Sequence, residues 1–316
     1  MRILLESLLT TANYMKLDRN KFFQGMMLGA VLLSMILVPN LSRGQDKTTQ
    51  TKNLYIVNID SIYSISKSIA SSSSALNPSP TPVPKKEKIV EENFGYCVNV
   101  PVLLYHHVQP DSEARRLWQT ALSVDSDIFE QQVSYLVSRG YTAISAKQLI
   151  DALLLRTPLP QKSIVLTFDD GYKDAYSYVY PILQKYRITA NLMIATGLVG
   201  GSDYLSWGEI EEMGRSGLVY FSNHTWSHYP IDQGGYDKAK YEIQTGRKQL
   251  EEHTNQIVNI FTYPYGSFNN EAIRALKDDG VLGAFSTIPG FWQCDSFIMT
   301  LHRNRVGNAS LSEYGL

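Results

Sequence analysis

The chain has 316 residues, a length that fits one large domain or two small ones. Its 29 basic and 30 acidic side chains nearly cancel, so it lacks the basic field that nucleic-acid binding needs, and we exclude that class of function. Two cysteines, Cys97 and Cys294, are too few for a disulfide scaffold or a cysteine-based zinc site, and both one bridge and two free thiols remain open.

The amino-terminal segment contains an apolar run at residues 22–38 that follows three basic side chains. A basic flank before an apolar run is typical of a secretory signal or a membrane anchor. The length of the run favours an anchor, whereas small residues before Gln45 fit a cleavage site. We therefore assign residues 1–44 to a signal peptide or an N-terminal membrane anchor. We expect an exported protein, extracellular or periplasmic, that residues 22–38 hold at the membrane if they stay uncleaved.

Residues 45–93 combine a serine run with alternating prolines. Serine gives flexibility and alternating proline favours extended polyproline II, so this segment has no packed core. We interpret it as a flexible tether in front of a catalytic domain at residues 94–316.

From Val98 onward, apolar strands alternate with amphipathic helices. The expected strands are 101–108, 163–168, 190–195, 218–222, 259–263 and 283–286. The expected helices are 127–139, 146–155, 176–186, one that begins after Ser206, 237–253 and 271–279. Two of these helices begin with capping boxes, Ser145 with Gln148 and Ser206 with Glu209. Repeated strand–helix units predict a parallel sheet, open or closed into a barrel.

Polar residues follow several of these strands directly. Asp169 and Asp170 come after the strand at 163–168, and His224 comes after the strand at 218–222. His106 lies toward the end of the first strand. Because barrel enzymes place their chemistry at the carboxyl ends of parallel strands, we expect these side chains to share one site.

Three motifs carry candidate chemistry. In Thr167–Gly171 (TFDDG), two adjacent carboxylates repel each other, and a divalent metal would relieve that repulsion, although Asp-Asp-Gly also fits a simple turn. In HTWSH, His224 and His228 are spaced to share one face of a helical turn and to bind one metal. One carboxylate and two imidazoles leave positions open for water, as a catalytic metal site requires.

The third motif, Tyr263–Gly266 (YPYG), is either a turn that ends a strand or a source of an oxyanion-binding amide. Pro264 has no N–H, so Tyr265 is the candidate donor.

Together these motifs resemble the polysaccharide deacetylases of carbohydrate esterase family four, over residues 101–306. The opening PVLLYHHV resembles the branch that deacetylates poly-N-acetylglucosamine. The resemblance implies a distorted (β/α) barrel with about seven parallel strands, the NodB-like fold. It also implies a divalent metal, most simply Zn²⁺ with Co²⁺ or Ni²⁺ as alternatives.

The resemblance implies a role for each motif residue. It places the metal on Asp170, His224 and His228. It makes Asp169 the general base and Tyr265 the oxyanion donor. The resemblance to the exopolysaccharide branch implies that His106 acts as the acid, with the neighbouring His107 as an alternative.

Other residues are expected near the substrate: His107, Tyr263, Pro264, Trp226 and Arg303. The chain departs from the family at Thr262, where an arginine that orients the base is common. Arg303 or Arg305 could take that function.

The sequence thus predicts a metal-dependent, monomeric hydrolase that removes N-acetyl groups from N-acetylglucosamine units of a polysaccharide and releases acetate. One alternative is an O-acetyl esterase acting on xylan or another acetylated glycan. The other is a tethered glycan-binding protein without catalysis.

Overall fold

The computed structural model describes residues 95–316. The signal or anchor expected at 1–44 and the tether expected at 45–93 lie outside these residues. None of the helices in the described part combines the length and the apolar character that crossing a bilayer requires.

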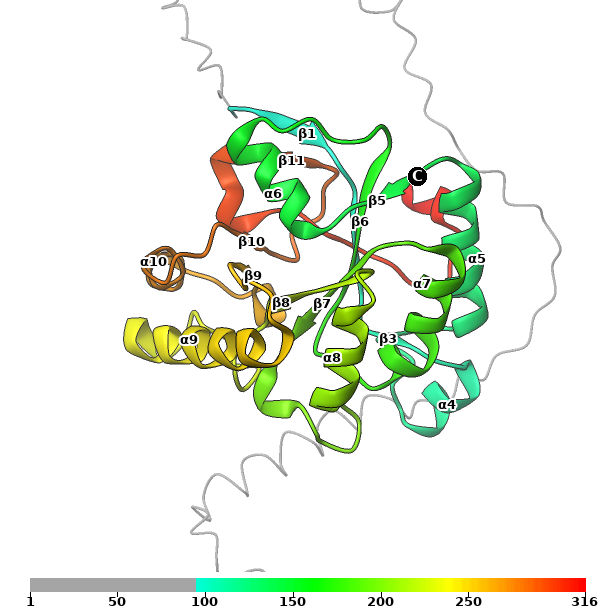
Figure 1. Ribbon diagram of the computed structural model, residues 1–316, viewed down its shortest axis with the longest axis horizontal. Helices are drawn as coiled ribbons and strands as arrows, with labels where there is room; N and C mark the ends of the chain where they lie inside the picture. The colour runs from blue at the N-terminus through cyan, green and yellow to red at the C-terminus, as the bar shows by residue number, and fades with distance from the viewer. Residues whose placement is uncertain (1–94) are drawn as a thin grey trace, which may run out of the picture. The chain divides into compact units, whose positions relative to one another are not determined.

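Parallel strands form the centre of the domain (Figure 1). Along the sheet the order is β10 (Gly283–Phe285), β9 (Ile260–Thr262), β8 (Val219–Asn223), β7 (Ala190–Ile194), β6 (Ser163–Phe168), β2 (Val102–Tyr105) and β12 (Asn304–Arg305). A further strand, β5 (Thr142–Ala143), pairs with the beginning of β6. An isolated parallel bridge joins Phe285 of β10 to Leu301, just before β12, so the sheet curves back toward its own first edge. The seven strands along this path, in the described residues, confirm the expected distorted barrel.

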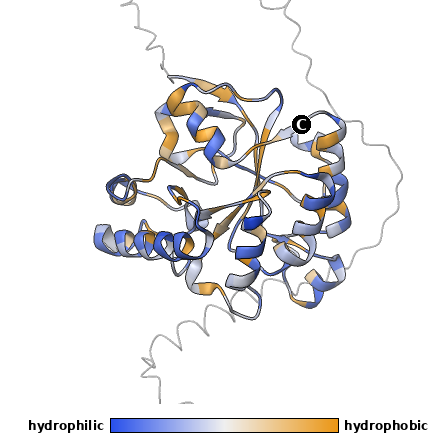
Figure 2. Ribbon diagram, viewed as in Figure 1, coloured by the Kyte–Doolittle hydropathy of each residue, from blue (hydrophilic) through white to orange (hydrophobic). Residues whose placement is uncertain are grey.

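Helices surround this sheet, with their polar faces outward (Figure 2). In chain order they are α4 (Asp111–Arg116), α5 (Ser126–Ser138), α6 (Ala146–Leu155), α7 (Tyr180–Tyr186), α8 (Trp207–Arg215), α9 (Gly235–Thr254) and α10 (Asn270–Asp278). The capping boxes at Ser145 and Ser206 are both present, so the predicted beginnings of α6 and α8 are confirmed.

The strand β6 lies inside the sheet, and all six of its residues are buried. At its end, Phe168 stacks on Tyr105 of β2 with ring centroids 5.1 Å apart. This aromatic packing therefore fixes where β2 and β6 end and where the loops that follow them begin.

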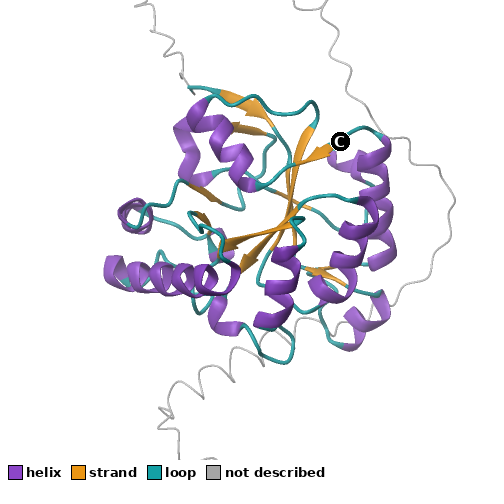
Figure 3. Ribbon diagram, viewed as in Figure 1, coloured by secondary structure: helices purple, strands orange, loops and turns teal. Residues whose placement is uncertain are grey.

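Several short elements differ from the expectations (Figure 3). The helix expected at 176–186 begins with a π-helical stretch, η1 (Ala175–Val179). The first expected strand divides into β2 and β3 (His107–Val108), and β3 pairs with β4 (Ser123–Val124) instead of joining the main sheet. The two-residue strands β4 and β5 are too short to produce a periodic pattern, which is why the sequence does not predict them.

The two cysteines form a disulfide. Cys97 lies in β1 (Cys97–Asn99) and Cys294 in β11 (Trp292–Cys294), and the two residues are direct partners of this antiparallel pair. Of the two alternatives left open by the sequence, the single bridge is the one present.

Candidate metal centre and active site

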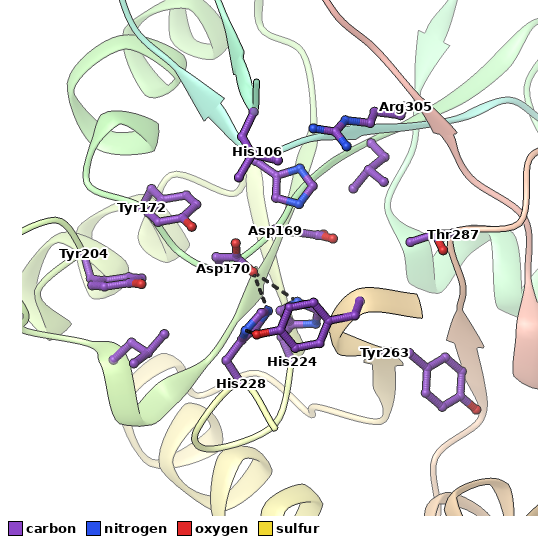
Figure 4. A pocket seen from close by; sticks show the side chains of 14 residues that line it. His106, Asp169, Asp170, Tyr172, Tyr204, His224, His228, Tyr263, Thr287 and Arg305 are labelled. Atoms are coloured by element: carbon purple, nitrogen blue, oxygen red, sulfur yellow. Dashed lines mark hydrogen bonds and ion pairs between the residues drawn. The ribbon is translucent and has the colours of Figure 1, made fainter. Parts of the chain in front are cut away.

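The polar residues singled out by the motifs come together at the carboxyl ends of the strands (Figure 4). His106 follows β2, the aspartate pair follows β6, His224 follows β8 and Tyr263 follows β9. They line a cavity of about 780 Å³. The other lining residues are Leu104, Leu122, Tyr172, Leu198, Tyr204, His228, Tyr265, Thr287 and Arg305.

Three ligand atoms converge on the floor of this cavity. The Nε2 atoms of His224 and His228 lie 3.2 and 3.0 Å from Oδ1 of Asp170. These three residues form a group whose ligand atoms all lie within 4.8 Å of one another. One carboxylate and two imidazoles are a donor set suited to a catalytic divalent ion.

The hydrogen bonds of this group also fit a metal. Nδ1 of His224 donates to the carbonyl of Thr262 at 2.8 Å, which leaves the Nε2 lone pair free for an ion. Nδ1 of His228 lies 3.1 Å from the hydroxyl of Tyr265. Oδ1 of Asp170 is buried and faces the Nε2 atoms of both histidines. A buried carboxylate oxygen beside two imidazole nitrogens is stabilised when a cation binds next to all three atoms.

The pKa values of Asp170 and His224 depend on each other, because the two side chains lie in contact. Burial raises the pKa of Asp170, but hydrogen bonds from His224 and His228 outweigh burial and hold the pKa far below its ordinary value. Burial lowers the pKa of His224, whereas Asp170 and Asp169 raise it, and the net result is a raised pKa. The carboxylate is therefore ionised and ready to bind a cation.

The two histidines do not share a helical turn, contrary to the expectation from their spacing. The segment from His224 to His228 is irregular, and Thr225 and His228 both have positive φ angles, 67° and 57°. These left-handed residues turn the chain back on itself. Convergence of the two imidazoles thus comes from a folded loop and not from helical periodicity.

The second aspartate, Asp169, is held by Arg303. The guanidinium donates to both carboxylate oxygens, Nη1 to Oδ1 at 2.6 Å and Nη2 to Oδ2 at 2.8 Å. It also donates to the carbonyl of Ser286 and to the hydroxyl of Thr167. Burial raises the pKa of Asp169, but the Arg303 guanidinium lowers it more, so the net pKa is below the ordinary value. Asp169 is thereby kept ionised with a fixed orientation.

On the opposite wall, the His106 imidazole points toward the aspartate pair (Figure 4). Burial lowers the pKa of His106 below its ordinary value, and Arg303 and Arg305 lower it further. Asp169 and Asp170 act in the other direction without reversing the shift. A neutral imidazole at neutral pH follows from this balance.

The YPYG turn lies at the edge of the cavity. Tyr265 has a φ of 60°, and its side chain is 69% exposed and packs edge-on against His228. Tyr263 is buried, and its hydroxyl donates to the carbonyl of Met299. Pro264 is buried in the short turn η3 (Pro264–Gly266) and is absent from the cavity lining.

Four of the expected substrate contacts, Pro264 among them, lie away from the cavity. Arg303 has no exposed side-chain surface because it is engaged by Asp169. His107 is buried behind the wall, 2.5 Å from Oδ2 of Asp174. Trp226 packs on Tyr241 and does not line the cavity. Adjacency in sequence to a motif residue is not enough to reach the cavity, because alternate residues face opposite sides of the chain.

Sequence reasoning missed two aromatic side chains of the cavity wall, Tyr172 and Tyr204. Their rings stack with centroids 5.2 Å apart, and Tyr172 also stacks on His107 at 3.6 Å. Tyr172 stands two residues after Asp170, and that proximity was the available signal. No motif pointed to Tyr204, which a long loop brings to the site.

Comparisons with known proteins agree with this geometry. Residues 156–284 match the family model described as polysaccharide deacetylase. The chain is 28% identical over 307 residues to the poly-beta-1,6-N-acetyl-D-glucosamine N-deacetylase of Escherichia coli O157:H7, with 83% of this chain and 44% of the relative covered. It is 28% identical over 177 residues to the enzyme of the same name from Staphylococcus aureus MRSA252, covering 52% of this chain and 61% of the relative.

Among solved structures, the fold matches the deacetylase PplD of Streptococcus pyogenes in complex with acetate. The TM-score is 0.64 and the identity 26%, over 69% of this chain and 98% of that one. The chain spans less than two thirds of the length of the two curated relatives named above, whereas it covers nearly all of the solved deacetylase.

Proposed function

We propose that this chain carries a polysaccharide deacetylase domain, since residues 156–284 match the family model of that description, and that it removes N-acetyl groups from N-acetylglucosamine units of a polysaccharide and releases acetate. The observation that carries the proposal is that the ligand atoms of Asp170, His224 and His228 lie close together. The adjacent Asp169 is held in place by Arg303. Similarity to two enzymes named for poly-beta-1,6-N-acetyl-D-glucosamine supports that polymer as the substrate.

In this proposal Asp170, His224 and His228 hold a divalent ion, Zn²⁺ in the first place, with Co²⁺ or Ni²⁺ as alternatives. When bound, such an ion acidifies a water molecule and polarises the acetyl carbonyl. Asp169 accepts the proton of the attacking water while Arg303 keeps its carboxylate in place. The backbone N–H of Tyr265 stabilises the developing oxyanion.

The departing sugar nitrogen needs a proton to leave as an amine. His106 is the candidate donor, since its ring faces the aspartate pair across the cavity. Because its pKa is lowered, His106 must gain a proton before it can deliver one. His106 takes this proton from solvent before the substrate binds, and Asp169 returns the proton of the attacking water to solvent afterwards, so the reaction balances and leaves acetate and a free amine.

We further propose that the protein is exported, acts as a monomer, and stays at the membrane if residues 22–38 are not cleaved. The Cys97–Cys294 disulfide supports an oxidising compartment outside the cytoplasm.

The test is acetate release from β-1,6-linked N-acetylglucosamine oligomers, measured with and without a chelator. We expect activity that is lost on metal removal, restored by Zn²⁺, and at least 100-fold lower in Asp169→Asn, because general-base catalysis contributes roughly 10²–10⁴-fold. Acetate release only from acetylated xylan would instead identify the O-acetyl esterase. Binding of oligomers without turnover in the metal-loaded protein would identify a glycan-binding protein.

A further inference from the structure

The loop that carries both histidines has an unusual backbone. Two non-glycine residues, Thr225 and His228, adopt left-handed conformations within four positions. Such conformations are strained in residues other than glycine and persist only where the surroundings impose them. Some neighbouring element must therefore hold this loop.

That element is α9, and the contact runs through Glu242. Its two carboxylate oxygens accept hydrogen bonds from Ser227, Oε2 from the backbone N–H and Oε1 from the hydroxyl, both at 2.8 Å. Its own backbone carbonyl accepts from the N–H of Trp226 at 3.1 Å. Glu242 thus holds the two residues that immediately precede His228.

The burial of this carboxylate is the notable feature. Glu242 has no exposed surface, although it lies on a helix that is mostly polar. Its cationic partner is Lys238, one turn earlier, whose Nζ lies 2.8 Å from Oε1. Burying a charge is costly unless it is paired and hydrogen-bonded, and an apolar side chain would fill the same space at lower cost. The carboxylate is therefore explained by the hydrogen bonds it accepts from the loop.

We propose that Glu242 is a positioning residue for the metal centre, acting through Ser227 on His228. By fixing Ser227, it sets the left-handed turn at His228 and aims Nε2 of that histidine at Asp170. This role rests on the proposed function, since it presupposes a metal at the site. Glu242 lies 14 residues beyond His228 in sequence, in none of the three motifs.

The variant Glu242→Gln tests this role with little change of shape. Glutamine keeps one oxygen acceptor but replaces the other with a donor. Whichever way the amide is oriented, its NH₂ then faces a group that can only donate, either the Ser227 N–H or the Lys238 ammonium. The measurement is the dissociation constant of Zn²⁺ in the full-length protein, by competition with a chromogenic chelator. We expect binding about 10–100-fold weaker, the range seen when partners that orient metal ligands are lost.

The matched control is Glu252→Gln on the same helix. Glu252 is exposed and has only a loose contact with Lys248, at 3.8 Å. We expect this variant to bind Zn²⁺ as the unmodified protein does.

A double-mutant cycle with Ser227→Ala identifies the route and needs no large core change, since Ser227 is on the surface. If Glu242 acts through Ser227, the losses in Zn²⁺ affinity of the two single variants should not add in the double variant. Wild-type Zn²⁺ affinity in Glu242→Gln, with or without a lower melting temperature, would overturn the proposal, as would full additivity. Failure of the unmodified protein to bind Zn²⁺ would instead count against the proposed function.

Discussion

At the scale of single residues, Asp169, the proposed base, is oriented by an arginine that lies far from it in sequence. The family-like arginine before the YPYG turn is replaced by Thr262, and the sequence left Arg303 and Arg305 as substitutes. Arg303 fills this place with a two-pronged contact to Asp169, whereas Arg305 is exposed and donates to the carbonyl of Ala121.

The geometry of this contact predicts the effect of Arg303→Lys. A lysine keeps the positive charge but cannot donate to both carboxylate oxygens in a planar fork. We expect kcat for acetate release to fall about 10–100-fold, as when other orienting contacts are lost, while the Zn²⁺ dissociation constant stays unchanged. Arg305→Lys is the control and should retain nearly full kcat. An Arg303→Lys enzyme with wild-type kcat would show that Asp169 needs charge alone.

His106 yields a prediction about the leaving group. If it protonates the departing amine, then His106→Asn should lower kcat on acetylated glucosamine oligomers by roughly 10²–10⁴-fold. An activated aryl acetate, whose phenolate leaves without protonation, should lose far less. The ratio of the two rates measures the effect within one variant, so errors in protein concentration cancel. Equal losses on both substrates would exclude His106 as the acid.

The pH profile provides a further test of His106. Burial places its pKa below the ordinary 6.5, so the protonated form is present only below that pH and disappears as pH rises. For the amide substrate, kcat/KM should therefore have a falling limb below about pH 6.5. Arg305→Ala removes a positive charge that lowers the pKa, so it should move this limb to higher pH. A profile that rises steadily through this range would contradict protonated His106 as the donor in the free enzyme.

At the scale of elements, the sequence predicted what has a strong local signature. Six consecutive buried residues identify β6, and its end places Asp169 and Asp170. Capping boxes identify the first residues of α6 and α8. These features depend on neighbours within one turn or one strand, so one sequence is sufficient to find them.

The parts that could not be predicted depend on distant pairing. Arg303 reaches Asp169 across 134 residues because the two-residue strand β12 lies beside β2. The left-handed turn at His228 depends on α9, through a buried carboxylate that resembles any other helical glutamate in sequence. Neither a short strand nor a helix–loop contact leaves a periodic pattern.

The packing of α9 against the histidine loop yields a prediction at Gly246. A Cβ there would lie 2.5 Å from Oδ1 of Asn223 and 3.0 Å from the backbone of Thr225. Alanine is normally the better helix former, by roughly 1 kcal/mol, but this clash should reverse the sign. We expect Gly246→Ala to destabilise the protein by about 1–3 kcal/mol, as overpacking does, and to weaken Zn²⁺ binding.

The control for this prediction is Gly208→Ala in α8, where nothing lies within 4 Å of the new Cβ. It should leave Zn²⁺ affinity unchanged and stability equal or slightly higher. Denaturant unfolding together with the chelator competition assay measures both quantities. A Gly246→Ala protein as stable as the Gly208→Ala protein would mean that α9 can move away from the loop without cost.

At the scale of the whole molecule, the candidate site and the disulfide lie at opposite ends of the barrel strands. The proposed metal ligands follow the carboxyl ends of β6 and β8, whereas β1 ends at Asn99, just before β2 begins. The disulfide between β1 and β11 therefore closes the amino-terminal end of the strands. Stability and chemistry are separated along the barrel, as is general for folds of this type.

This separation predicts the effect of removing the disulfide. Cys97 and Cys294 are 197 positions apart, and a bridge that closes so long a loop restricts the unfolded chain strongly. Replacing both by alanine should lower the free energy of unfolding by about 2–5 kcal/mol, and reductant should have the same effect on the unmodified protein. Zn²⁺ affinity and kcat at a temperature well below the transition should not change, because the metal ligands belong to the other end of the strands. A loss of Zn²⁺ affinity in the folded double variant would show that the two ends are mechanically coupled.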